Sequence, residues 1–217
     1  MLVELAREQM IEQQVRAWDV LDERILETLR AVPRERFVPR AWSELAFADC
    51  ELPLPHGKRM LRPMLVGRIL QALNVKKAEQ VLEVGTGSGY VSACLARLGG
   101  QVRTLELHED IAQTARANLQ TAAPGLPVEV LTADGMQLSD ESRYDVIVLT
   151  ASLPIYQPQF ERALRPGGRL FAVVGAQVPQ QACLVRRLGP RDCSTEVLFE
   201  TVFEPLEHAP RPPQFGF

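Results

Sequence analysis

The 217-residue chain has no apolar run long enough to cross a bilayer. Its first residues also lack the charged stretch followed by an apolar one that marks a secretory signal. We therefore expect a cytoplasmic protein with no membrane partner. Basic charge is not in excess either, because 24 lysines and arginines stand against 27 aspartates and glutamates. Binding to nucleic-acid phosphates needs a basic surface, so we expect no nucleic-acid partner.

Metal-binding patterns are absent from the sequence as well. The four cysteines and three histidines are scattered without the spacing of metal ligands, which predicts no metal site. No repeat or low-complexity tract divides the chain, and a hydrophobic content of 46% is enough for a full core. We predict one domain over residues 1–217, with an N-terminal part (1–78), an α/β core (79–206) and a tail (207–217).

What the chain does contain is an apolar strand, residues 80–84, that runs into a glycine-rich turn and then a helix. Glycines allow positive φ angles and let the main chain come close to a ligand, so this turn predicts a nucleotide-type ligand at the end of the strand. A dinucleotide site would have a third glycine where this chain has Tyr90. A glycine run after a strand is also often only a tight turn.

Acidic residues at three strand ends indicate which ligand is bound. Glu83, two residues before the first glycine, suits an ammonium or sulfonium charge, and S-adenosylmethionine carries both. Glu106 ends the second strand and can accept ribose hydroxyls, while Asp134 follows the third and can take the adenine amino group. One such acid alone is more often a helix cap or a solvated loop residue. Three acids at the ends of successive strands, all consistent with the same sheet topology, favour S-adenosylmethionine as the cofactor.

The predicted cofactor-binding residues share these strand ends and the glycine turn. They are Glu83, Gly85, Thr86, Gly87, Ser88, Gly89, Glu106, Leu107, Asp134, Gly135 and Thr150.

Strand and helix patterns alternate from residue 79 onward, which predicts an α/β fold with a parallel sheet covered on both faces. The predicted strands are 80–84, 101–106, 127–132, 144–150 and 168–174, the helices between them are 88–98, 109–121 and 156–165, and a terminal hairpin pairs 182–187 with 196–203. Helices are also predicted over 3–17, 22–32 and 63–73. The proline-rich tail beyond Pro205 is expected to be poorly ordered unless it packs back on the body.

At this point the chain resembles the protein-L-isoaspartate (D-aspartate) O-methyltransferase family, from about residue 8 to residue 206. The glycine turn alone indicates only a class I methyltransferase, whereas the run Val-Pro-Arg-Glu-Arg-Phe-Val-Pro at 32–39 is far more specific. The resemblance implies a Rossmann-like class I fold, with a mostly parallel doubly wound sheet, an N-terminal helical elaboration and a C-terminal antiparallel hairpin.

The resemblance also implies a function. Members of the family methylate isoaspartyl residues of damaged proteins, which is a cytoplasmic repair reaction that turns S-adenosyl-L-methionine into S-adenosyl-L-homocysteine. Isoaspartyl proteins or peptides would be the partners, and the state would be monomer or dimer.

The loop before Pro63 departs from the family pattern, Gly-Gln-Thr-Ile-Ser-x-Pro. Arg59 stands at the position of the threonine and Leu61 at that of the serine usually regarded as catalytic. Methyl transfer from a sulfonium to a carboxylate neutralises both charges, so positioning and removal of water matter most and the lost serine is tolerable. Leucine cannot hydrogen-bond an acceptor, but Lys58, Arg59 or Arg62 can clamp a carboxylate. The alternative is that these basic side chains face solvent, as isolated charges on a loop usually do.

The candidate catalytic residues are therefore Arg59, Leu61 and Arg62. Two alternatives to isoaspartyl methylation stay open: another acidic small-molecule or peptide acceptor held by the arginines, and a non-catalytic protein that only binds S-adenosylmethionine. We further expect Ser152 to be a pocket hydroxyl, and Trp18 and Trp42 to pack in the core.

Overall fold

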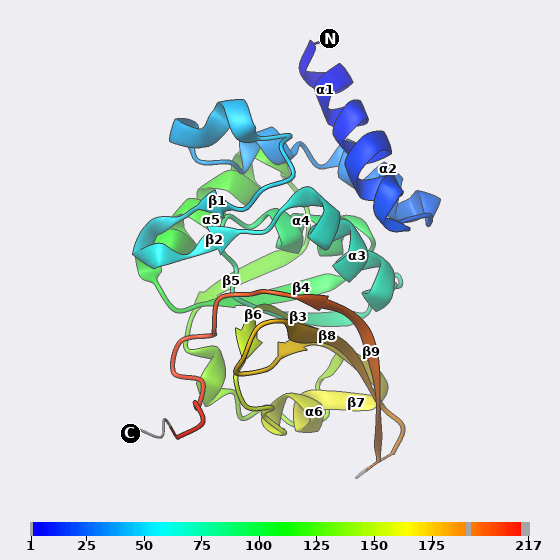
Figure 1. The fold of residues 1–217 in the computed structure, drawn as a ribbon, viewed down its shortest axis with the longest axis vertical. Helices are drawn as coiled ribbons and strands as arrows, with labels where there is room; N and C mark the ends of the chain where they lie inside the picture. Colours follow the sequence, from blue (N-terminus) through cyan, green and yellow to red (C-terminus); the bar gives the residue numbers. More distant parts are fainter. Residues whose placement is uncertain (1, 190–191, 214–217) are drawn as a thin grey trace.

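The computed structural model describes residues 2–189 and 192–213. Its centre is a seven-stranded sheet in the order β5-β4-β3-β6-β7-β8-β9 (Figure 1). The strands are β3 (Gln80–Val84), β4 (Gln101–Glu106), β5 (Val128–Thr132), β6 (Tyr144–Leu153), β7 (Leu164–Val174), β8 (Gln180–Arg187) and β9 (Cys193–Thr201). The strands from β5 to β7 pair in parallel, and β8 and β9 are added antiparallel. The Rossmann-like sheet and the terminal hairpin are confirmed.

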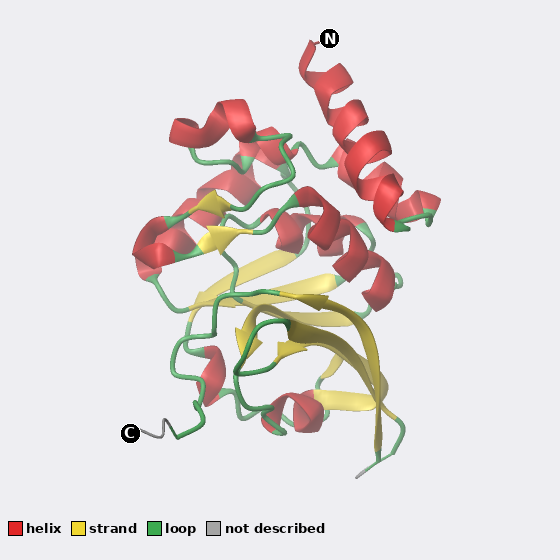
Figure 2. Cartoon of the chain, in the orientation of Figure 1, coloured by secondary structure: helices red, strands yellow, loops and turns green. Residues whose placement is uncertain are grey.

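Helices cover the two faces of the sheet unequally (Figure 2). One face carries α3 (Pro63–Leu73), α4 (Tyr90–Arg97) and α5 (Glu109–Ala122), whereas the other carries α6 (Gln159–Ala163) and the 3-10 turn η6 (Gly135–Gln137). Successive residues of β6 point to opposite faces, so Val148 joins the core under α3 and α4 while Leu149 joins the core beside α6. The predicted helix 156–165 is shorter than expected, because only five of its residues are helical.

The N-terminal helices follow the predicted pattern. α1 (Leu2–Met10) continues through a π-helical turn, η1 (Ile11–Val15), and a 3-10 turn, η2 (Arg16–Trp18). α2 (Glu23–Ala31) begins after Asp22, whose side chain accepts a hydrogen bond of 2.9 Å from the Arg24 backbone N–H. Short 3-10 turns follow, η3 (Arg34–Arg36) and η4 (Arg40–Leu45). No helix in the described part of the chain is long and apolar enough to cross a membrane.

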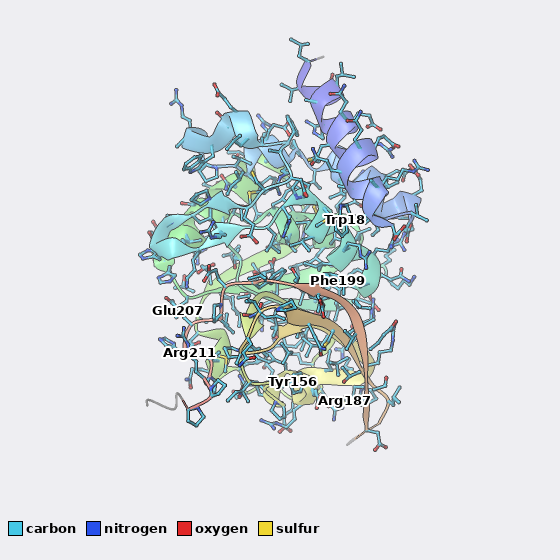
Figure 3. All side chains as sticks on the ribbon, in the orientation of Figure 1. Trp18, Tyr156, Arg187, Phe199, Glu207 and Arg211 are labelled. Carbon is cyan, nitrogen blue, oxygen red and sulfur yellow. The ribbon has the colours of Figure 1, made fainter. Side chains whose placement is uncertain are left out.

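The expectation that both tryptophans pack in the core is wrong. Trp18, which Figure 3 labels, is 55% exposed, and Trp42 is 40% exposed. Both lie in short 3-10 turns that contain no buried residue.

The segment 49–62 contains a small antiparallel ribbon of β1 (Leu52–Pro53) and β2 (Arg59–Met60). The 3-10 turn η5 (Pro55–Gly57) joins the two strands. Leu52 and Met60 face each other across the ribbon and are both buried, which anchors it on the body of the protein. The ribbon therefore presents Arg59 at a fixed place.

The first part of the tail packs back on the body. Ser152 N–H donates to the Glu204 carbonyl (2.9 Å), and Leu206 N–H donates to the Ser152 carbonyl (2.8 Å). We refer to residues 203–209 as the C-terminal segment; it crosses the carboxyl end of β6. Residues 214–217, the last part of the predicted tail, lie outside the described residues.

The contact between α3 and the N-terminal helices yields a stability prediction. A Cβ on Gly67 would lie 2.6 Å from Val15 Cγ1. An exposed helical Gly→Ala change gains up to about 1 kcal/mol, but here we expect Gly67→Ala to lower the free energy of unfolding by about 1–3 kcal/mol through overpacking. The free energy of unfolding of the wild type and of Gly67→Ala is measured by urea unfolding. The double variant with Val15→Ala should be more stable than the sum of the single effects, and additive effects would contradict this contact.

Candidate functional site

A cleft opens where the parallel strands end. Its walls come from six separate parts of the chain, as expected for the carboxyl edge of an α/β sheet. They are the ribbon and its flanks (Glu51, Leu54, Lys58, Arg59, Leu61), the end of β3 with the glycine loop (Val84, Gly85, Gly87), the end of β4 (Leu105, Glu106, Leu107, His108), Ala133–Gly135, Thr150–Ala151, and Phe203–Glu207.

A smaller cavity, the inner cavity, lies between the ribbon and the glycine loop. Its lining includes Leu61 and Arg59 on one side and Glu83, Tyr90 and Thr150 on the other. Arg59, Leu61, Gly85, Gly87 and Thr150 line both spaces, so the inner cavity adjoins the cleft.

The glycine loop owes its shape to positive φ angles: 96° at Gly85, 54° at Gly87 and 85° at Gly89. Thr150 Oγ1 donates to the Gly85 carbonyl at 2.5 Å, and a Cβ on Gly85 would lie 2.3 Å from that oxygen. The predicted residue Thr150 therefore holds the loop as well as lining the cleft. Gly89 lines neither space and instead starts α4.

Thr86 and Ser88 support the loop from inside. Both are buried and line the inner cavity. The hydroxyl of Thr86 lies 2.7 Å from that of Thr104, and the Ser88 carbonyl accepts a hydrogen bond of 3.0 Å from Asn118 Nδ2. Neither hydroxyl is placed on the wall of the larger cleft.

Glu106 is held rigidly at the edge of the cleft. One carboxylate oxygen accepts from Gly87 N–H (3.0 Å) and the other from His108 N–H (3.2 Å). Each oxygen keeps a further lone pair, so the carboxylate can still accept two hydroxyl groups from a ligand. Leu107 lines the cleft beside it. The role of Glu106 as the acceptor of ribose hydroxyls stays a prediction.

Glu83 is fully buried beneath the glycine loop. Oε2 accepts a hydrogen bond from the Ser92 hydroxyl, whereas Oε1 has no partner among the described residues. Burial raises the pKa of this carboxyl to about 7, against the lowering effect of the hydrogen bond from Ser92. An unpartnered buried oxygen on the wall of a cavity is suited to receive a cationic group of a ligand.

Asp134 lines the cleft, whereas Glu83 lines the inner cavity. Asp134 Oδ1 accepts from Met136 N–H (2.8 Å), and its Oδ2 lies 2.8 Å from His208 Nδ1. Gly135 packs so closely on β3 that a Cβ would lie 2.2 Å from Val84 Cγ1. Asp134 and Gly135 thus both reach the cleft, as predicted.

The C-terminal segment is the part of the site that the sequence did not predict. Glu207, labelled in Figure 3, lies 3.1 Å from Lys58 Nζ and 2.9 Å from His108 Nε2. It therefore ties the ribbon to the end of β4 across the cleft. The acidic and histidine residues at 204–208 were the only available signal, and their proline-rich surroundings obscured it.

The three predicted catalytic residues are placed differently. Leu61 is buried, and Arg59 is half-exposed, with its Nε 4.0 Å from Glu51 and 3.9 Å from Glu204. Arg62 lines neither space, and its Nε is buried without a hydrogen-bond partner among the described residues. Arg62 precedes α3 as its N-cap residue, and its catalytic role stays a prediction.

The prediction for Ser152 is corrected. It is fully buried, and its hydroxyl donates to the Phe203 carbonyl (3.0 Å) rather than facing a ligand. Within residues 2–189 and 192–213 no group of three or more histidine, cysteine, aspartate or glutamate side chains is arranged to hold a metal ion.

Comparisons with known proteins agree on one family. The sequence model of protein-L-isoaspartate(D-aspartate) O-methyltransferase matches residues 5–210. The chain is 38% identical over 188 residues to the protein-L-isoaspartate O-methyltransferase of Koribacter versatilis, covering 86% of this chain and 84% of that protein. It is 41% identical over 186 residues to that of Methanoculleus marisnigri, covering 84% of each.

The fold has a solved counterpart as well. A Plasmodium falciparum protein assigned to the protein-L-isoaspartate O-methyltransferases, crystallised with S-adenosyl-L-homocysteine, superposes with a TM-score of 0.81 at 18% identity. The match covers 93% of this chain and 98% of the other. At this identity the similarity concerns the fold alone.

The buried carboxyl of Glu83 yields a pH prediction. Its pKa of about 7 exceeds the ordinary value of 4.5, so the folded protein retains a proton that the unfolded chain releases. The stability linked to this proton is complete below pH 4.5 and is lost as pH rises through 7. The loss amounts to at most about 3 kcal/mol. Glu83→Gln should remove this component from the free energy of unfolding measured in urea between about pH 5 and pH 8.

The control for Glu83→Gln is Glu129→Gln, since the Glu129 side chain is 55% exposed and pairs with Arg103 at the surface. Parallel stability curves for the wild type and Glu83→Gln would contradict the raised pKa.

Proposed function

The chain belongs to the protein-L-isoaspartate(D-aspartate) O-methyltransferase family, and we propose that it methylates the free carboxylate of isoaspartyl residues in proteins with S-adenosylmethionine. The observation that carries the proposal is the family match over residues 5–210 together with the convergence of Glu83, Glu106 and Asp134 on adjoining spaces. Three acids at successive strand ends are what a cationic nucleoside ligand requires.

The residues present fit S-adenosylmethionine. Glu83 has an unpartnered buried oxygen for the ammonium group, Glu106 can accept the ribose hydroxyls, and Asp134, which lines the cleft, would accept the adenine amino group in place of its contact with His208. The glycine loop supplies close main-chain approach between them. When bound, the cofactor supplies an electrophilic methyl group on a sulfonium centre.

The chain's own contribution to the reaction is positioning and exclusion of water. A carboxylate acceptor carries no proton at neutral pH, so no general base is needed. Leu61 presents an apolar surface to both spaces, which removes water from the acceptor. Arg59 lines the same wall and can clamp the acceptor carboxylate, because its contacts with Glu51 and Glu204 are long enough to be exchanged.

Because Arg59 and Leu61 stand where the family pattern has hydroxyl residues, a second class of methyl acceptor is also tested. An acidic small molecule or another acidic peptide would suit Arg59 equally, since an arginine clamp recognises any carboxylate.

We also propose a cytoplasmic location. Cys50, Cys94, Cys183 and Cys193 are all free thiols, which fits a reducing compartment.

Methyl transfer to peptides tests the proposed function. We expect base-labile methyl incorporation into an isoaspartyl peptide and none into the peptide with a normal aspartate at the same position.

Glu106→Gln should weaken S-adenosyl-L-homocysteine binding by about tenfold or more, because a charged acceptor of hydroxyls is lost. Calorimetry measures that affinity.

Two outcomes would contradict this function. Turnover with another acidic acceptor alone would show that the substrate has changed. Cofactor binding without turnover on any acceptor would show a non-catalytic binding protein.

The role of Arg59 can be tested separately. Arg59→Ala should raise the KM for the isoaspartyl peptide by about tenfold, since a charge-assisted contact is lost. The affinity for S-adenosyl-L-homocysteine should stay nearly unchanged. Arg59→Thr with Leu61→Ser, the family pair, should recover part of the loss. The matched control is Arg165→Ala, because Arg165 is similarly exposed and pairs with Asp145 near the amino end of β6. An unchanged KM for Arg59→Ala would show that Arg59 only faces solvent.

A further inference from the structure

Arg34, in the Val-Pro-Arg run, has no part in the site as described so far. We propose that Arg34 is a positioning residue that fixes the separation of the two walls of the inner cavity, where methyl transfer takes place if the proposed function holds. The proposal thus deepens that function by adding a residue that acts from behind the walls.

The guanidinium of Arg34 is fully buried and bonded to carbonyl groups. Nε donates to the Ala46 carbonyl (3.0 Å) and Nη2 to the Leu61 carbonyl (2.9 Å). Leu61 follows β2 directly and lines the inner cavity. The guanidinium therefore holds the wall of the cavity next to the ribbon through the main chain of residue 61. This contact does not depend on which side chain stands at position 61.

The same guanidinium contacts the opposite wall. Its central carbon lies 5.2 Å from the centroid of the Tyr90 ring, within the range of a cation–π contact. Tyr90 is the first residue of α4, follows Gly89 directly, and lines the inner cavity. Phe37, from the same Val-Pro-Arg-Glu-Arg-Phe run, supports the ring from another side at 5.6 Å. Arg34 therefore links the ribbon to the glycine loop.

The charge of Arg34 is costly, which argues for a specific role. Its Nη1 is buried without a hydrogen-bond partner among the described residues, and burial lowers the pKa of the guanidinium. An apolar side chain of similar volume would fill the space without the desolvation cost. It would not hold two carbonyl groups and an aromatic ring in one fixed geometry.

Arg169 offers a matched control. It is also buried and donates to two carbonyl groups, those of Leu73 and Asn74. It pairs with Glu79, just before β3, and so lies at the end of the strand away from the cleft. Loss of either arginine should destabilise the protein, but only loss of Arg34 should disturb the inner cavity.

The experiment compares Arg34→Lys and Arg34→Met with Arg169→Lys and Arg169→Met in the full chain. Four quantities are measured on the folded fraction: kcat and KM for the isoaspartyl peptide, affinity for S-adenosyl-L-homocysteine, and the rate of trypsin cleavage after Lys58 and Arg59, read by mass spectrometry. Both cleavage sites lie on or next to β2.

We expect Arg34→Met to lower kcat by about 10- to 100-fold, as a displacement of about 1 Å does. Cleavage of the ribbon should become faster, and affinity for S-adenosyl-L-homocysteine should change less than kcat, since Glu106 and Asp134 are untouched. Arg34→Lys should lie between Arg34→Met and the wild type, because lysine can still donate to one of the two carbonyls. It also supplies a test if Arg34→Met does not fold.

Equal kcat and equal ribbon cleavage in the Arg34 and Arg169 variants, at matched loss of stability, would show that Arg34 is merely structural and would overturn the proposal. The failure of the proposed function is recognisable by itself, because the wild type would then methylate no isoaspartyl peptide. In that case ribbon cleavage still decides whether Arg34 holds the two walls.

Discussion

The parallel pairing of β3 with β4 on one side and β6 on the other is the constraint on which the site depends. In this register Val84 lies beside Leu105 and Leu149. The next residue of each strand, Gly85, Glu106 or Thr150, therefore arrives at the same edge. A shift of one residue in either pairing would turn that side chain to the other face of the sheet and remove it from the cleft.

The parts of the fold that local patterns determine were predicted from the sequence. The bounds of β3, β4 and α3 agree with the prediction, because short apolar runs and the proline at position 63 mark them within the chain itself. Strand ends were sufficient to place Glu106, Asp134 and Thr150, because the topology of parallel strands is restricted. Glu83 was found by the same reasoning, although its burial and its raised pKa were not.

What the sequence could not provide depends on contacts between distant segments. Arg62 and Arg59 look alike in the sequence, and only the register of the ribbon with Leu52 decides which of them reaches the cleft. Ser152 was expected to face a ligand, but the return of residues 203–206 buries it. Nothing in a proline-rich composition distinguishes a tail that packs back from one that does not. The side chain of Arg34 shows the same limit, since its partners are 12 and 27 residues away.

The position of the C-terminal segment couples ligand binding in the cleft to the docking of residues 203–207. Phe203–Glu207 form one wall, so a molecule that fills the cleft binds only the protein in which this last stretch is docked. By mass action, a ligand at 100 times its dissociation constant stabilises that arrangement by about 2.7 kcal/mol. The pairs of Glu207 with Lys58 and His108 mean that the segment cannot leave without freeing the ribbon from the end of β4. Undocking of residues 203–207 would therefore remove one wall of the cleft and at the same time break the link between the ribbon and the end of β4.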